Sequence, residues 1–127
     1  MRVLIIDPSP HAGQQMERTL HARGIQVHQA ETLCEGVRWL LLNAADAILV
    51  DARLPGLSGP GDLRPLTEIA GAAPVLVVVG ERATGLAEAY RRRGLLTLPR
   101  PLDIEALVLM LGRLAAPAGT GRNAPLS

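Results

Sequence analysis

The chain has 127 residues, 48% of them hydrophobic and 20% charged, and a formal net charge of +1. This length suits one domain with a hydrophobic core, and the near-neutral charge gives no general affinity for polyanions. The single cysteine excludes an internal disulfide, and one Trp, one Tyr and no Phe leave no aromatic platform for single-stranded nucleic acid. No apolar run approaches the ~18 residues of a membrane span, and no signal-peptide pattern is present. We therefore expect a cytoplasmic protein that binds neither membranes nor, by itself, nucleic acid.

The first half of the chain alternates apolar strand patterns with helical patterns. In chain order, the sequence predicts a strand over 3–6, a helix over 10–23, a strand over 25–28, a helix over 33–42 and a strand over 47–51. Ser9 followed by Pro10 is typical of a helix start, and Gly24 is typical of a helix end. The first and third strands each end at a carboxylate, Asp7 and Asp51.

The second half continues the alternation. The predicted elements are a helix over 60–70, a strand over 75–79, a helix over 83–93, a strand over 95–98 and a helix over 104–115. Pro65 falls inside the first of these helices unless that helix begins near it, because an interior proline removes a hydrogen bond. Residues 117–127 show neither periodicity nor apolar content, which predicts a flexible tail or linker.

Five consecutive strand–helix units predict an α/β domain over residues 1–116. Strands that alternate with helices form right-handed crossovers and a parallel sheet covered on both faces. The expected fold is thus a (βα)5, flavodoxin-like three-layer sandwich with a five-stranded parallel sheet. The carboxyl ends of its strands form the edge where ligands bind in open α/β sheets.

Asp51 and the loop after it resemble the phospho-acceptor segment of receiver domains from bacterial two-component response regulators. The matching residues are Asp51, Leu54, Pro55, Ser58 and Gly59. The resemblance implies a receiver fold in which a histidine kinase transfers a phosphoryl group to Asp51. An alternative from the residues alone is that Asp51 only caps the loop by accepting backbone hydrogen bonds.

The sequence departs from the pocket that this resemblance implies. Receiver domains hold Mg²⁺ with two acids after the first strand, but here Pro8 follows Asp7. Val79 stands at the position of a Thr or Ser, and Arg100 stands at the position of a Lys. Thr97 replaces an aromatic residue of the fifth strand. We therefore expect a degenerate phosphorylation pocket, with a Mg²⁺ site at Asp7 and Asp51 that is weak or absent, and no other cofactor.

Arg53 offers a further interpretation of this pocket. A guanidinium from Arg53 or Arg100 could pair with Asp7 and Asp51 and fill the cation site permanently. The alternative is that Arg53 simply points into solvent.

The leading functional hypothesis is an atypical receiver domain that is not an enzyme and signals through protein–protein contacts, independently of ordinary phosphorylation. It could control an attached DNA-binding output domain. The first alternative is a working phospho-acceptor modified on Asp51 by a histidine kinase. The second is a flavodoxin-like domain that binds a small molecule in the strand-end crevice.

The last predicted helix also suggests a contact surface. Its core-facing stripe consists of Ile104, Leu107, Val108, Leu111 and Ala115, whereas Leu109 falls on the opposite side and Met110 at the edge of the stripe. Receiver domains often dimerise through the fourth helix, fifth strand and fifth helix. We therefore predict a homodimer that uses Leu109 and Met110.

Overall fold

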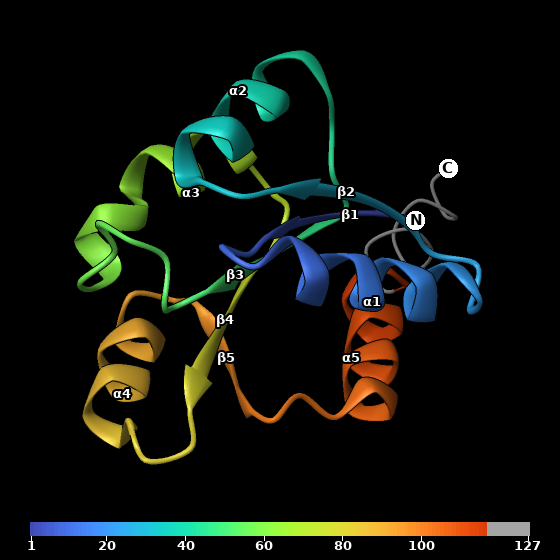
Figure 1. Cartoon of the computed structure of the whole chain (residues 1–127). Coiled ribbons are helices and arrows are strands. Elements are labelled where there is room, and N and C mark those ends of the chain that lie inside the picture. Colours follow the sequence, from blue (N-terminus) through green and yellow to red (C-terminus); the bar gives the residue numbers. More distant parts are fainter. Residues whose placement is uncertain (117–127) are drawn as a thin grey trace, which may run out of the picture.

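Parallel pairing of five strands builds the centre of the molecule. The computed structural model describes residues 1–116. The strands are β1 (Arg2–Ile6), β2 (Gln26–Ala30), β3 (Ala47–Asp51), β4 (Val75–Gly80) and β5 (Leu96–Arg100), in the order β2–β1–β3–β4–β5. The helices are α1 (Pro10–His21), α2 (Leu33–Leu42), the 3-10 helix η1 (Pro60–Leu63), α3 (Arg64–Ala70), α4 (Thr84–Arg92) and α5 (Ile104–Ala116). This arrangement confirms the predicted (βα)5 fold (Figure 1). The predicted tail at 117–127 lies outside the described residues.

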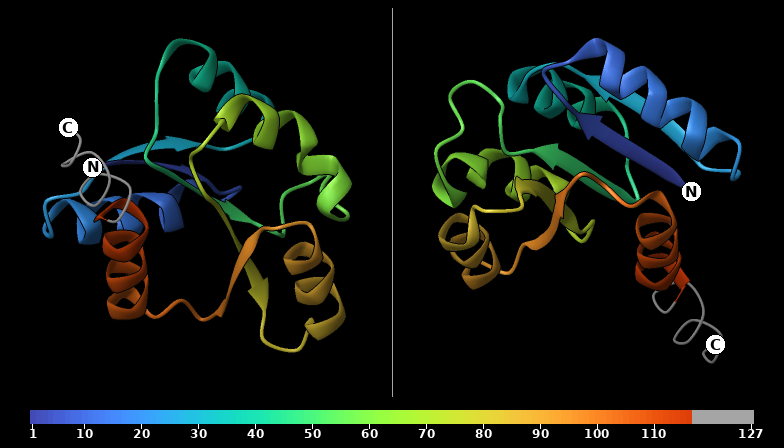
Figure 2. Two further views of the ribbon diagram at one scale, coloured as in Figure 1. Left: turned by 180° about the vertical axis from the view of Figure 1, so that it is seen from behind. Right: turned by 60° about the horizontal axis from the view of Figure 1, so that its bottom comes forward.

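The helices form a layer on each face of the sheet. Helices α1 and α5 cover one face, and α2, α3 and α4 cover the other (Figures 1 and 2). Successive strand residues point to opposite faces, so Ile48 and Val50 of β3 pack toward one layer while Ala47 and Leu49 pack toward the other. Because both faces are buried, the central strands consist of continuous aliphatic runs, as expected for a parallel sheet.

Helix starts follow the local signals in the sequence. The Ser9 hydroxyl accepts a hydrogen bond from the Ala12 backbone N–H at 3.3 Å, and the Thr32 hydroxyl accepts one from Glu35 at 3.0 Å. The Glu35 carboxylate accepts the backbone N–H of Glu31, one residue before the cap. Side-chain caps of this kind satisfy backbone donors that would otherwise lack partners.

The predicted helix over 60–70 is two elements rather than one. A 3-10 turn at Pro60–Leu63 precedes the α-helix Arg64–Ala70, and Pro65 lies in the first turn of that α-helix. A proline is tolerated there because the N–H that it lacks would have no partner within the helix. The prediction of a single helix was therefore wrong at its N-terminal end, because the α-helix begins at Arg64 and not at Pro60.

The fifth strand runs farther than the sequence pattern indicates. It begins at Leu96 and ends at Arg100, whereas the prediction stopped at residue 98. Pro99 is accommodated because β5 is an edge strand and needs no second partner. The extension brings Arg100 level with the end of β4, where it pairs in register with Gly80. This position aims Arg100 at the carboxyl ends of the central strands.

Candidate functional site

Asp51 is the centre of the candidate site. It is the last residue of β3, its side chain is 5% exposed, and it is the one charged residue in the buried set of the described chain. A buried carboxylate is costly unless it is paired and hydrogen-bonded. The structure meets this requirement with two arginines, Arg53 and Arg100, which we call the arginine clamp.

Arg53 binds Asp51 from the adjoining loop. Its backbone N–H donates to Asp51 Oδ1 at 2.7 Å, and its NH2 group donates to Oδ2 at 2.8 Å. Its Nε lies 3.1 and 3.2 Å from the two carboxylate oxygens. Of the alternatives that the sequence left open, the structure shows Asp51 accepting a backbone hydrogen bond from its loop, and it shows Arg53 paired with Asp51 rather than pointing into solvent. The Arg53 side chain is nevertheless 56% exposed, so only its charged edge is held.

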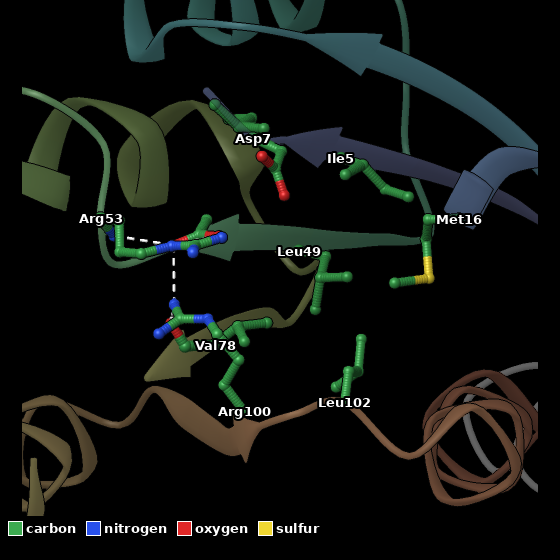
Figure 3. Close-up of a pocket in the computed structure, with 10 residues that line it drawn as sticks. Ile5, Asp7, Met16, Leu49, Arg53, Val78, Arg100 and Leu102 are labelled. Carbon is green, nitrogen blue, oxygen red and sulfur yellow. Dashed lines mark hydrogen bonds and ion pairs between the residues drawn. The ribbon is translucent and has the colours of Figure 1, made fainter. Parts of the chain in front are cut away.

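Arg100 binds Asp51 from the far side of β4. Its NH2 group donates to Asp51 Oδ1 at 2.8 Å and to the Val78 carbonyl at 3.1 Å. Its side chain is 26% exposed, so it is better buried than that of Arg53. Both guanidiniums meet at the carboxylate in Figure 3. An arginine in this position supplies a fixed, planar set of donors that a lysine would not.

The electrostatics of the clamp favour ionised Asp51. Burial alone would raise the pKa of Asp51, but the hydrogen bonds from Arg53 and the charges of both arginines outweigh it. The pKa of Asp51 is therefore below its usual value. The same hydrogen bond to Asp51 raises the pKa of Arg53. The three groups thus form a stable charge cluster at neutral pH.

Asp7 approaches the same cleft from the end of β1, as predicted. Its Oδ1 accepts the Ser9 backbone N–H at 2.8 Å, and its charge acts on Arg53. Asp7 forms no ion pair within residues 1–116, so the predicted pairing of an arginine with both acids holds only for Asp51. Pro8 turns the chain between Asp7 and the Ser9 cap and contributes no carboxylate.

The structure places Val79 away from the cleft. Its side chain is buried in the core layer beneath α4, and it lines a groove between α4 and β5 together with Thr97 and Ala87. Thr97 accepts a hydrogen bond from Arg91 NH1 at 2.9 Å. The two positions singled out in the sequence as a missing hydroxyl and a missing aromatic residue therefore border one groove.

Sequence reasoning missed part of the cleft. The Val78 carbonyl, which anchors Arg100, is a backbone acceptor that no side-chain pattern reveals. Beside the clamp lies a cavity of about 120 Å³ whose apolar lining includes Ile5, Met16, Leu49 and Leu102 (Figure 3). From the sequence, only the alternation of side chains along the two strands could have indicated that Ile5 and Leu49 line this cavity.

The positions that the resemblance places around a magnesium ion differ in what they offer it. Both oxygens of Asp51 are engaged by guanidinium groups, and Pro8 has no ligand atom in its side chain. Within residues 1–116, no group of three or more His, Cys, Asp or Glu side chains is placed to hold a metal ion. Hard cations of this kind need charged oxygen ligands; within residues 1–116 the carboxylate of Asp51 is paired with arginine and that of Asp7 is not.

Leu109 and Met110 lie on α5. Leu109 is 60% exposed, while Met110 is partly buried against the core layer shared by α1 and α5. Leu107 and Leu111 are fully buried, which confirms the phase predicted for the helix. Separately, none of the helices in residues 1–116 combines the length and apolar character needed to cross a membrane.

Known proteins resemble the chain over almost its whole length. The model of the response regulator receiver domain family matches residues 3–111. Protein PilH of Pseudomonas aeruginosa is 31% identical over 118 residues, which cover 91% of this chain and 98% of PilH. Response regulator MprA of Mycobacterium sp. is 28% identical over 90% of this chain, which spans only 50% of MprA.

A solved structure supports the same fold. The receiver domain of sensor histidine kinase PA1611 from Pseudomonas aeruginosa superposes with a TM-score of 0.77 at 24% identity. The match covers 91% of this chain and 97% of that domain, which has a magnesium ion coordinated in its active site cleft. With the fold, the position of Asp51 and the family match in agreement, the chain belongs to the response regulator receiver domain family of two-component signalling.

Proposed function

We propose that this receiver domain is an atypical one, which signals through protein–protein contacts and does not depend on Mg²⁺-assisted phosphorylation of Asp51. The observation that carries the proposal is the arginine clamp, in which both oxygens of Asp51 accept guanidinium hydrogen bonds. A carboxylate attacks a phosphoryl group with a free lone pair, so the clamp opposes that attack. On this proposal the domain is a binding module, not an enzyme.

Three further features support the proposal. Pro8 supplies no acid to hold a cation between Asp51 and a phosphoryl group, and such charge neutralisation is what phosphoryl transfer requires. Val79 has no hydroxyl to bind a phosphoryl oxygen and faces the core. Arg100 is held by Asp51 and by the Val78 carbonyl, so its positive charge is already committed.

The partners on this proposal are proteins. Histidine kinases and other signalling proteins are the partners of the family, and self-association through α4, β5 and α5 would use exposed Leu109 with Met110. Control of a DNA-binding output domain in a longer protein belongs to the same proposal. In such a chain, the clamp would hold the domain in one state, and the partner rather than a phosphoryl group would change it.

One observation favours the alternative that Asp51 still accepts a phosphoryl group from a histidine kinase. The Arg53 side chain is 56% exposed and comes from a loop, so its guanidinium can leave Asp51 without disturbing the core. Arg100 would then supply the one remaining positive charge. This alternative predicts phosphorylation that Arg53 slows but does not prevent.

The deciding experiment combines NMR with chemical phosphorylation. A titration of ¹⁵N-labelled protein with Mg²⁺ and beryllium fluoride should give no saturable shifts around Asp7 and Asp51 at sub-millimolar metal. Labelling by acetyl phosphate should be slow in the parent chain and much faster after Pro8→Asp and Arg100→Lys together, with Arg53→Ala added to open the clamp. Asp51→Asn should abolish labelling in the restored variant. A parent chain that labels as fast as the restored variant would establish the alternative.

A further inference from the structure

The cavity beside the clamp has no role in the proposed function. It measures about 120 Å³ and lies between the ends of β1 and β3, α1 and the segment after β5, where Ile5, Met16, Leu49 and Leu102 form an apolar wall. For comparison, an apolar cavity of roughly 150 Å³ takes up a molecule the size of benzene. The space therefore suits a small aliphatic group.

Charged groups of both signs line the mouth of this cavity. Asp7, Arg53 and Arg100 all line it, and in Figure 3 the Arg53 guanidinium lies between Asp7 and Arg100. Asp51 and Asp7 carry two negative charges and the two arginines carry two positive ones, so the mouth has no net charge. It is dipolar, with a carboxylate on the β1 side and guanidiniums on the side of β3 and β5.

Both the guanidinium groups and the Asp7 carboxylate at the mouth keep atoms that make no hydrogen bond within residues 1–116. Within residues 1–116, the clamp uses Nε and NH2 of Arg53 and NH2 of Arg100, which leaves the NH1 group of each guanidinium for another acceptor. Asp7 accepts Ser9 N–H with Oδ1, and Oδ2 is left for a donor. A molecule with one cationic and one anionic group would satisfy both.

We propose that this cleft binds a small zwitterion, namely an α-amino acid with a short aliphatic side chain. Its ammonium group pairs with Asp7, its carboxylate with NH1 of Arg100 or Arg53, and its side chain lies against Met16, Leu49 and Leu102. The inference rests on the proposed function, because a phosphoryl group on Asp51 would occupy the same mouth. A ligand placed there contacts Leu102, in the segment that leads into α5.

Matched ligands test the recognition of both charges. Calorimetry and ¹⁵N NMR in EDTA would compare L-leucine with 3-methylbutylamine, which lacks the carboxylate, and 4-methylpentanoate, which lacks the ammonium group. We expect leucine or L-valine to bind saturably and each single-charge analogue to bind at least about tenfold more weakly, since each loses a charged hydrogen-bond set. No saturable binding of either amino acid below about 10 mM, or equal binding of an analogue, would overturn the inference.

Variants locate the binding in the cleft. Asp7→Asn should weaken leucine binding at least about tenfold and leave 4-methylpentanoate unaffected, since only the ammonium group pairs with Asp7. Leu49→Phe should block leucine by filling the cavity, and Met16→Phe is the second variant if Leu49→Phe does not fold. Glu68→Gln, on the exposed surface of α3, is the matched control and should change nothing.

The two proposals fail separately. Leucine binding together with fast acetyl phosphate labelling would remove the proposed function only. Slow labelling without leucine binding would remove only the ligand inference, and leucine binding unchanged by Asp7→Asn would place the ligand elsewhere and overturn it as well.

Discussion

Arg100, the last residue of β5, donates to Asp51, the last residue of β3, across the intervening strand β4, with 2.8 Å between Arg100 NH2 and Asp51 Oδ1. The same NH2 group donates to the Val78 carbonyl of β4 at 3.1 Å. One guanidinium therefore joins the carboxyl ends of three neighbouring strands. The contact links residues 49 positions apart in sequence, so it fixes the tertiary arrangement of the cleft.

Replacing Arg100 should destabilise the domain more than replacing an exposed arginine. Arg100→Met leaves buried Asp51 with Arg53 as its only cation, and losing hydrogen bonds to a charged group costs about 1.5–3 kcal/mol. Urea unfolding should show this loss. Arg64→Met is the matched control, because Arg64 and Glu68 are 78% and 65% exposed, and such surface pairs contribute about 0–1 kcal/mol. Equal effects of the two variants would contradict a structural role for the clamp.

The clamp also predicts how stability changes in acid. The pKa of Asp51 is lower in the folded state than in the unfolded chain, because Arg53 and Arg100 favour its ionised form. Its contribution is therefore complete above the unfolded pKa of about 3.9 and is lost as the pH falls through the folded pKa. In Asp51→Asn, the free energy of unfolding should therefore decrease less steeply than in the parent as the pH falls below about 4.

A second carboxylate serves as the control for that measurement. Hydrogen bonding and charge from Arg23 lower the pKa of Glu105 as well, so its contribution to stability is also lost in acid. Glu105 is on the surface, where solvent screens the pair. Glu105→Gln should therefore flatten the profile less than Asp51→Asn does, and the reverse order would show that the clamp contributes little.

Gly36 allows α2 to lie close to β1. A Cβ atom at this position would lie 3.0 Å from Ile6 Cγ1 and closer still to Cδ1. Gly36→Ala should thus destabilise the domain by about 1–3 kcal/mol despite the better helix propensity of alanine. Ile6→Val in the same chain should recover part of the loss, because it removes Cδ1.

The control for this pair is a glycine with open space. Among residues 1–116, nothing lies within 4 Å of a Cβ placed on Gly112 of α5, so Gly112→Ala should stabilise by up to about 1 kcal/mol. Thermal or urea unfolding of the parent, Gly36→Ala, Ile6→Val and the double variant measures the coupling between Gly36 and Ile6. Additive effects of Gly36→Ala and Ile6→Val would show that the two residues do not conflict.

Tyr90 buries a hydroxyl group without a partner. Its side chain is 0% exposed, and within residues 1–116 its oxygen makes no hydrogen bond. Burial, with the charge of Asp62, raises the pKa of Tyr90. Tyr90→Phe should therefore leave stability unchanged or raise it by about 1 kcal/mol, since it removes an unsatisfied polar group. Tyr90→Leu should destabilise through lost volume, and a clear loss in Tyr90→Phe would reveal a hidden partner such as a bound water.

Self-association through α5 should be broken by a charge on its exposed face. Leu109 is 60% exposed, and burying such a side chain contributes roughly 1.5–3 kcal/mol per copy before the cost of association. We expect a weak dimer in analytical ultracentrifugation and a monomer after Leu109→Glu, with the melting temperature nearly unchanged. Leu42→Glu, which changes an 85% exposed residue of α2, should not alter assembly. A parent chain that stays monomeric at several hundred micromolar would refute the dimer.

The sequence predicted the fold well because strong local signals coincide with the architecture. Aliphatic runs, the Ser9 and Thr32 caps and Gly24 at φ 81° all lie where local chemistry indicates an element start or end. The errors fall where tertiary contacts decide. Pairing with β4 extends β5 past Pro99. The α-helix with Pro65 in its first turn begins only after a 3-10 turn.

The site was only partly predictable. Asp7 and Asp51 follow from strand ends, because parallel strands bring their carboxyl ends to one edge, whereas Arg100 was singled out by the family resemblance, since the predicted fifth strand stopped at residue 98. Whether Arg53 would turn toward Asp51 or toward solvent depends on a side-chain conformation that no spacing specifies, and both alternatives were open. The orientation of Val79 toward the core could have been read from its alternation with Val78, which shares its layer with Leu76.

Trp39, the one tryptophan of the chain, stacks on His28 at 4.7 Å and lies beside Arg2. These neighbours belong to the starts and middle of β1 and β2, so the indole sits away from the carboxyl ends where the cleft opens. Intrinsic fluorescence therefore reports on the α2–β2 edge and not on the cleft. A change in Trp39 emission on adding a ligand to the cleft would signify a rearrangement transmitted through the sheet. An unchanged emission spectrum would be compatible with binding confined to the cleft.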